Sequence, residues 1–185
     1  MGDFLRFYLH IPIFLRTFAR NMTEQQIEAR AQRAVELFKQ GFNCSQAVFA
    51  SCADLYGIDD EQLALRLSAS FGGGMGRMRL VCGAASGMFM LAGLECGSAT
   101  PHDNEGKMCN YKRVQQLAGD FKDKYGSLIC AELLGLAPKG QCDCKLDLDP
   151  RPAERTPEYY EKRPCAEMIA EAVRIFILTQ NQTKS

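Results

Sequence analysis

The sequence lacks several features that mark common classes of protein function. It contains no tryptophan and only two histidines, and its 22 Lys and Arg residues are balanced by 22 Asp and Glu residues. Because nucleic-acid binding depends on a basic surface, this balance predicts no nucleic-acid partner. No apolar run reaches the roughly 18 residues that a membrane span needs. We therefore expect neither a nucleic-acid complex nor a membrane span.

Short motifs of familiar enzymes are also missing. The chain has no C-x-x-C, so thioredoxin-type exchange and covalent haem attachment lack their motifs. The glycine-rich stretch FGGGMGR, residues 71–77, follows no strand pattern and has no G-K-S/T, so it predicts no nucleotide-binding loop. His10 and His102 stand in the N-terminal segment and in a loop, which gives a Cys–His hydrolase poor support.

Cysteine is the residue type that the chain has in excess, with nine in 185 residues. A chain of this length, 46% hydrophobic, can bury a proper core without disulfide staples. The cysteine count is odd, and no secretion signal is evident. We therefore expect reduced cysteines in a cytoplasmic protein, where they serve metal or redox chemistry.

The N-terminal segment differs in character from the rest of the chain. In residues 1–21 the apolar run is broken by His10 and Pro12, and we interpret the segment as an extension of uncertain role. The stretch Thr23-Glu24-Gln25-Gln26 is a capping box, which marks the start of a helix. Residues 22–185 are therefore assigned to one cysteine-bearing helical domain.

Helical periodicity and stop signals divide this domain into helices joined by loops. We expect the third helix to turn Leu63, Leu67 and Phe71 inward, and residues 137–157 to form an irregular connection. No alternating strand pattern is present, so the prediction is an all-α bundle of about six or seven helices. The expected helices run from Thr23 to Gly41, from Asn43 to Gly57, from Asp59 or Asp60 to the glycine-rich stretch, from Cys82 to Cys96, from Asn104 to Tyr125, over 127–135, and from Pro164 onward.

Four of the cysteines fall in the first turn of a predicted helix. There the unpaired N–H groups and the positive end of the helix dipole favour a thiolate. The alternative for each is a free cysteine buried as a small hydrophobe, but the shared placement makes the set our candidate metal-binding or cofactor-binding ligands. They are Cys44, Cys82, Cys130 and Cys165.

The remaining cysteines give weaker signals. Cys52 and Cys96 are interpreted as small core or boundary residues, and Cys109 is a reserve candidate near another helix start. Cys142 and Cys144 form a Cys-Asp-Cys that is either a local dithiol, an extra metal clip, or two loop thiols with no shared role.

Gly83 and Gly87 lie four residues apart, so on a helix they share one face that has no side chains. Such a face lets another backbone, a cofactor or a second subunit come close to the Cys82 sulfur. We expect the face to keep Cys82 accessible, which makes both glycines candidate cofactor-binding residues.

At these residues the sequence resembles the putative redox-active protein family that is named for its C…GCAxxG…C…C cysteine pattern. The resemblance covers about residues 24–180, and in this chain the central motif has the order Cys-Gly-Ala with Val81 before it. It implies a small helical protein with four characteristic cysteines and a redox or metal role, without a defined reaction. The matching pieces are Asn43-Cys44-Ser45-Gln46-Ala47, Phe71–Gly76, Cys82-Gly83-Ala84-Ala85-Ser86-Gly87, Cys130-Ala131-Glu132-Leu133-Leu134-Gly135 and Cys165.

Two chemistries stay open at this point. In the first, the four thiolates converge on an iron–sulfur cluster or an ion such as zinc, for electron transfer. In the second, the cysteines form a thiol–disulfide carrier in which Cys82 is the attacking thiolate. A structural zinc site in an interaction module is a third, weaker reading. A redox partner is implied without being identified, and a homo-oligomer is possible.

Overall fold

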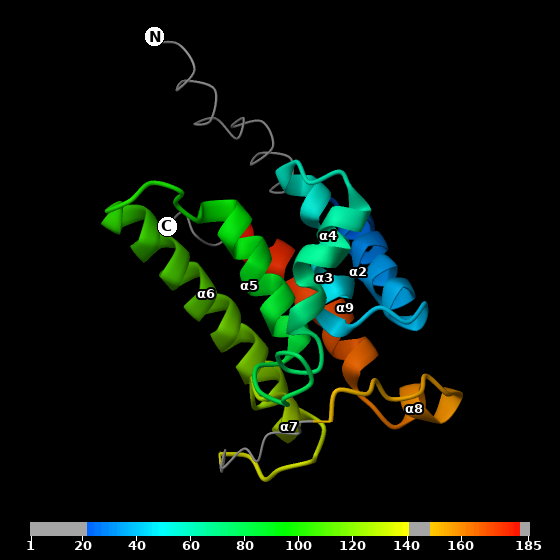
Figure 1. Ribbon diagram of the computed structural model, residues 1–185. Coiled ribbons are helices and arrows are strands. Elements are labelled where there is room, and N and C mark those ends of the chain that lie inside the picture. The colour runs from blue at the N-terminus through cyan, green and yellow to red at the C-terminus, as the bar shows by residue number, and fades with distance from the viewer. Residues whose placement is uncertain (1–21, 141–148, 182–185) are drawn as a thin grey trace.

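The computed structural model describes residues 22–140 and 149–181, which fold as an all-α bundle (Figure 1). The predicted fold class is confirmed. Residues 1–21, and with them His10, as well as Cys142 and Cys144, lie outside the described residues. The elements are α2 (Glu24–Lys39), α3 (Cys44–Ala50), η1 (Ala53–Tyr56), α4 (Glu61–Ser68), η2 (Ala69–Phe71), α5 (Gly83–Cys96), α6 (Asn104–Tyr125), α7 (Cys130–Leu133), α8 (Pro157–Glu161), α9 (Cys165–Leu178) and η3 (Thr179–Asn181), where η marks a short 3₁₀ turn. Across the described ranges, no helix combines the length and the apolar character that crossing a bilayer requires.

Two capping boxes determine where the first helices begin. The Thr23 hydroxyl accepts from the Gln26 N–H at 3.2 Å, and the Thr23 N–H donates back to the Gln26 side chain at 2.8 Å. Asn43 and Gln46 repeat this exchange at 3.1 and 2.9 Å. Because the cap satisfies otherwise unpaired N–H groups, it fixes the register of the helix that follows. Cys44 is thereby placed as the first residue of α3.

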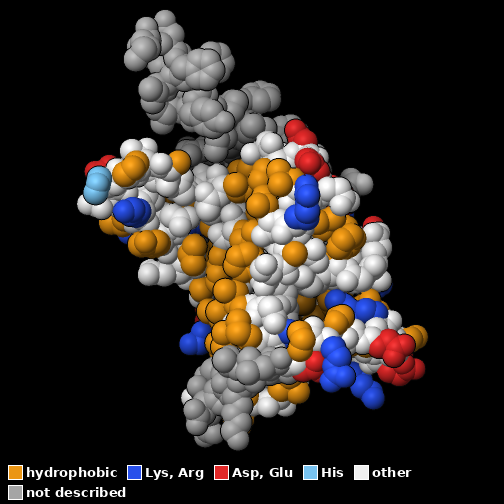
Figure 2. All heavy atoms as spheres, viewed as in Figure 1, with side chains coloured by type: hydrophobic (Ala, Val, Ile, Leu, Met, Phe, Trp, Pro, Cys, Tyr) orange, Lys and Arg blue, Asp and Glu red, His pale blue; other side chains and the backbone are white. Residues whose placement is uncertain are grey.

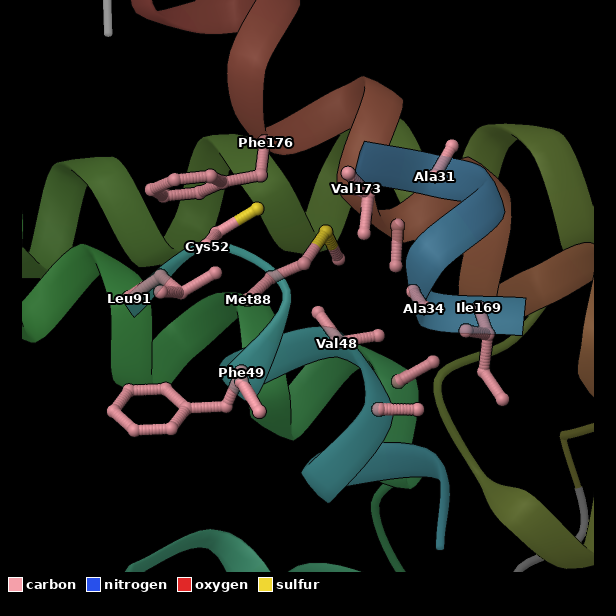
Figure 3. Close-up of a cluster of buried hydrophobic side chains, with 14 of the residues drawn as sticks. Ala31, Ala34, Val48, Phe49, Cys52, Met88, Leu91, Ile169, Val173 and Phe176 are labelled. Carbon is pink, nitrogen blue, oxygen red and sulfur yellow. The ribbon is translucent and has the colours of Figure 1, made fainter. Parts of the chain in front are cut away.

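The core lies where α2, α3, α5 and α9 meet (Figure 3). Alanines of α2 let the neighbouring helices approach, and Met88, Val173 and Phe176 fill the centre between them. Cys52, which follows α3, points into this cluster and is fully buried, as expected for a small core residue.

The second and third predicted helices differ from the observed ones. The second was expected to continue to Gly57 but ends at Ala50, where the Ser51 hydroxyl bonds back to the Val48 carbonyl at 2.8 Å. The chain then makes the 3₁₀ turn η1, whose last residue is followed by Gly57 in the left-handed conformation.

The predicted inner face of α4 is wrong. Leu63 and Leu67 are 40% and 49% exposed, and the face that packs on α3 carries Ser68 instead. The Ser45 hydroxyl at the start of α3 donates to the Ser68 carbonyl at 2.7 Å, and with α4 in this orientation Leu65 is buried while Leu63 and Leu67 face outward. Hydrophobic side chains accordingly gather on the surface that α4, α5 and α6 share in Figure 2.

The chain between α7 and α9 is more regular than expected. A five-residue helix, α8, begins at Pro157, the last residue of the segment 137–157 that was predicted to be irregular, and was not predicted. Thr156 caps it and Pro157 occupies its first position. The helix expected over 127–135 is shorter than predicted, because α7 begins only at Cys130. Ser127 lies before it, where its hydroxyl accepts from the Ile129 N–H at 2.9 Å and donates to Glu132.

Candidate functional site

The four candidate cysteines lie at helix starts on one end of the bundle, the lower end in Figure 1. Cys44, Cys130 and Cys165 are the first residues of α3, α7 and α9, and Cys82 directly precedes α5. The predicted helix-start positions are thus confirmed. Each of the four thiols is close enough to at least two of the others for their charges to shift its pKa or theirs.

The glycine face of α5 brings Cys44 to this end. A Cβ added at Gly83 would stand 3.0 Å from the Cys44 Cβ, and one at Gly87 would stand 2.8 Å from the Val48 Cβ. The glycine face is therefore covered by α3. Of the three neighbours considered for this face, namely another backbone, a cofactor and a second subunit, the structure shows the first. The expectation that this face keeps Cys82 open is wrong, because Cys82 is only 6% exposed.

A short antiparallel bridge brings Cys82 and Cys130 together. Val81 pairs with Ile129, the Cys82 N–H donates to the Leu128 carbonyl at 2.7 Å, and the Cys130 N–H donates to the Leu80 carbonyl at 2.6 Å. These bonds hold the segment just before α5 beside the segment that leads into α7. Two cysteines that are 48 positions apart in sequence thus become neighbours.

The glycine-rich stretch before this bridge winds in the left-handed conformation. Every residue from Gly73 to Arg77 has a positive φ, and Gly74 lies so close to Cys130 that a Cβ there would be 2.7 Å from the Cys130 Cβ. Glycine adopts this conformation without steric cost, whereas Met75 and Arg77 pay for it locally. The stretch is a tight turn, as predicted, and its close approach to Cys130 explains the glycine at position 74.

Three of the four cysteines line one cavity of about 280 Å³. Cys44, Cys130 and Cys165 contribute to its wall, whereas the buried Cys82 does not. The other lining residues are Asn43, Gly72, Gly73, Gly76, Arg77, Arg79, Leu134, Pro150, Pro152, Ala153, Arg155, Tyr159 and Arg163.

Cys165 is the thiol that this environment activates. A hydrogen bond from the Cys44 side chain, with the positive charges of Arg163, Arg155 and Arg79, outweighs burial and lowers the pKa of Cys165 to about 7. The same contact raises the pKa of Cys44 well above its usual range, because Cys44 supplies the proton and is itself buried. The two residues thus form a thiol–thiolate pair at neutral pH.

The other two cysteines of the set are not activated. Burial and the charge of Cys130 raise the pKa of Cys82 to about 12, although the N–H groups of Ala84 and Ala85 oppose the shift. Burial also raises the pKa of Cys130, against the charge of Arg79. Placement at a helix start was expected to favour a thiolate at all four sites. Burial overrides that effect at Cys82 and Cys130, and the hydrogen bond to Cys165 together with burial overrides it at Cys44.

The cysteine arrangement can be compared with those of known protein families. The family model described as "Putative redox-active protein (C_GCAxxG_C_C)" matches residues 42–177. The chain belongs to this family. No curated protein and no solved structure matches it.

The matched range contains every element of the site. It begins one residue before the Asn43 cap of α3 and ends within α9. Where the family pattern is written with Gly-Cys-Ala, this chain has Cys82-Gly83-Ala84, so that a glycine stands in the first turn of α5 against Cys44.

The described residues do not form a ready metal site. Within 22–140 and 149–181, no three Cys, His, Asp or Glu side chains are arranged so that they could hold a metal ion.

Cys96 and Cys109 lie away from the end of the bundle that carries the other four cysteines. Cys96 is the last residue of α5, its sulfur is 3.8 Å from the Asn110 amide nitrogen, and Cys109 is exposed on α6.

Sequence reasoning missed the two arginines beside Cys165. Arg155 and Arg163 flank α8, a helix that was not predicted from the sequence, so their positions could not be inferred. The signal was present, since a Thr-Pro pair followed by Glu is typical of a helix start. Arg79, just after the glycine-rich stretch, is a third arginine whose charge lowers the pKa of Cys165, and it also lowers that of Cys130.

Proposed function

We propose that this member of the family is a thiol–disulfide redox protein in which Cys165 attacks a substrate disulfide and Cys44 resolves the mixed disulfide. The observation that carries the proposal is that Cys44 and Cys165 lie in the wall of one cavity with three arginines, an environment that lowers the pKa of Cys165 to about 7. The thiolate is the nucleophile in such exchange, and the best attacking thiol has a pKa near the ambient pH. Cys165 meets this condition, while Cys82 is buried and protonated at neutral pH.

The reaction balances with these two residues and the substrate alone. The Cys165 thiolate forms a bond to one sulfur of R–S–S–R, the S–S bond breaks, and the leaving thiolate takes the proton that Cys44 held. The Cys44 thiolate then attacks the Cys165 sulfur and expels the second R–S⁻. One thiol and one thiolate leave, and the thiolate takes a proton from water. The two cysteines, now joined as a disulfide, have given up two electrons to the substrate.

The arginines of the cavity support the first step. The charges of Arg163, Arg155 and Arg79 lower the pKa of Cys165, so they hold the attacking sulfur as the thiolate. Cys130 lines the same cavity with a raised pKa, so it is not the first nucleophile.

A metal ion or an iron–sulfur cluster held by the four cysteines is the second candidate. Its support is the gathering of four thiols at helix starts, since thiolates suit both zinc and iron–sulfur clusters. We assign it no reaction step, because the described cysteines do not meet as a ligand set. Iron, zinc and acid-labile sulfide measured on anaerobically purified protein test it, and a stoichiometric metal content would favour this candidate over the first.

Trapping of the mixed disulfide tests the redox proposal. The reduced protein is mixed with 2-hydroxyethyl disulfide, quenched by alkylation and mapped by mass spectrometry. We expect wild type to end with a Cys44–Cys165 disulfide, Cys44→Ser to stop with the reagent on Cys165, and Cys165→Ser to form neither. Cys109→Ser is the control, because Cys109 is exposed but lies outside the cavity. Unchanged oxidation of Cys165→Ser would contradict the proposal.

A further inference from the structure

Apart from the Cys165 thiolate, the charged side chains that line the cavity in the described part of the chain are all cationic. Four arginines line it, namely Arg77, Arg79, Arg155 and Arg163, and among the described residues no Asp, Glu, Lys or His does. Clefts lined by charge of one sign concentrate ligands of the opposite sign. A cavity of about 280 Å³ lies near the lower end of the sizes that hold small molecules.

Two of these arginines are held by aromatic rings rather than by carboxylates. The Arg155 guanidinium stacks over Phe38 and Tyr159, each ring centroid 4.7 Å away, and Arg163 stacks over Tyr159 at 4.6 Å. Neither forms an ion pair with an acidic side chain in the described part of the chain. Arg155 donates to the Phe42 carbonyl at 3.4 Å, and its Nη1 is buried without a hydrogen-bond partner.

The aromatic support fixes where these cations point. Tyr160 of α8 packs edge-on against Phe38 at 5.5 Å, and its hydroxyl reaches the Lys39 carbonyl at 3.3 Å, so α8 is docked on the end of α2. A planar guanidinium that is held on a ring face keeps its N–H edge available for a carboxylate. Beside Arg155 and Arg163, the ionised Cys165 contributes one negative charge.

We propose that the cavity recognises a small disulfide that carries carboxylate groups close to its sulfurs. This inference rests on the proposed redox function and specifies its substrate class. Arg163 and Arg155 bind the carboxylates while the disulfide lies against the sulfur of Cys165. A thiolate repels an anionic substrate in water, and the arginines remove that penalty.

Three disulfides that differ chiefly in charge test this inference. Dithiodiglycolate is anionic, 2-hydroxyethyl disulfide is neutral and cystamine is cationic. The rate constant for oxidation of the reduced protein is measured by anaerobic stopped flow at pH 8.5, where Cys165 is ionised. We expect dithiodiglycolate to react about tenfold or more faster than the neutral reagent, with an advantage that falls as salt is added. Equal rates for the anionic and cationic reagents would overturn the inference.

Arg163 is the better of the two positions to vary, because Arg155 is packed among three rings. Arg163→Gln should reduce the anionic-to-neutral rate ratio by about three- to tenfold, and Arg163→Lys should retain most of it. The ratio cancels any effect of Arg163 on the Cys165 nucleophile, which is common to both reagents. Lys112→Gln, which removes one charge from the exposed side of α6, should leave the ratio unchanged. A ratio that Arg163→Gln does not alter would contradict the assignment.

A binding measurement separates this inference from the redox proposal. In Cys44→Ser/Cys165→Ser, which cannot react, calorimetry with dithiodiglycolate should detect binding that salt and Arg163→Gln both weaken. Such binding without oxidation of the wild type would retain the anion site and overturn the redox chemistry. Oxidation without such binding would retain the chemistry and overturn the anion site.

Discussion

Cys44 and Cys165 are chemically identical residues at equivalent helix positions, yet their pKa values shift in opposite directions. Two thiols in contact share a single proton more readily than they lose both, because two thiolates side by side repel each other. After the Cys44 hydrogen bond, the charges of Arg163, Arg155 and Arg79 lower the pKa of Cys165 further. The asymmetry gives one cysteine the role of nucleophile and the other that of resolving thiol.

Substitution of Cys44 tests whether its hydrogen bond activates Cys165. Because that bond is the largest cause of the lowered pKa, Cys44→Ala should raise the pKa of Cys165 from about 7 and move its alkylation midpoint to higher pH. At pH 7 the alkylation rate of Cys165 should fall roughly fivefold. Cys44→Ser keeps a hydroxyl donor and should retain a midpoint near that of wild type. The rate is measured with iodoacetamide and mass spectrometry of the Cys165 peptide, with exposed Cys109 as the internal reference. A midpoint near 7 in Cys44→Ala would show that the arginines suffice.

At the scale of elements, the features that were predicted correctly from the sequence are those that depend on interactions between neighbouring residues. The capping boxes at Thr23 and Asn43 and the bounds of α6 depend on neighbouring residues, and the structure agrees with all of them. The inner face of α4 depends on a bond between Ser45 and Ser68, which are 23 positions apart. Leu63 and Leu67 therefore could not be placed from periodicity alone.

The candidate site divides in the same way. The sequence correctly predicted that four cysteines lie at helix starts. Which of these cysteines are neighbours in space depends on contacts between segments that are distant in the chain. Gly83 against Cys44 and the Val81–Ile129 bridge are such contacts. The arginine wall was missed for the same reason, because it needs α8 to dock on Phe38 of α2.

The crossing of α3 and α5 offers a test within one helix. Gly87→Ala should destabilise the protein by about 1–3 kcal/mol, because the new Cβ would stand 2.8 Å from the Val48 Cβ and 3.1 Å from the Ser45 carbonyl oxygen. Gly93→Ala in the same helix meets nothing within 4 Å and should stabilise it by about 0.5–1 kcal/mol. Urea unfolding followed by circular dichroism gives both values. Equal effects of the two substitutions would mean that α3 does not contact the glycine face.

At the scale of the whole molecule, one buried cation ties the end of the bundle opposite the cysteines. Arg113 of α6 is 4% exposed and donates to Glu95 of α5 at 2.8 Å, to the Phe176 carbonyl of α9 at 2.9 Å and to the Thr179 hydroxyl at 2.8 Å. It satisfies groups on α5, on α9 and on η3, the turn that follows α9. Helical periodicity places its neighbour Val114 on the inner face and gives no sign of a buried charge at 113.

Arg113→Met should therefore destabilise the protein by about 3–5 kcal/mol in urea unfolding, because it leaves Glu95 charged and largely buried without a partner. Arg33→Met removes an arginine from the exposed Arg33–Glu61 pair and should cost less than about 1 kcal/mol. If the unpaired carboxylate is the cause, Arg113→Met/Glu95→Met should recover much of the lost stability. A loss that persists would show that packing of the arginine matters more than its charge.

Arg113 contacts the end of α9 remote from Cys165, so the alkylation midpoint of Cys165 should stay near 7 in the folded Arg113→Met variant. A moved midpoint would mean that strain at this end of α9 reaches the cysteine pair thirteen residues away.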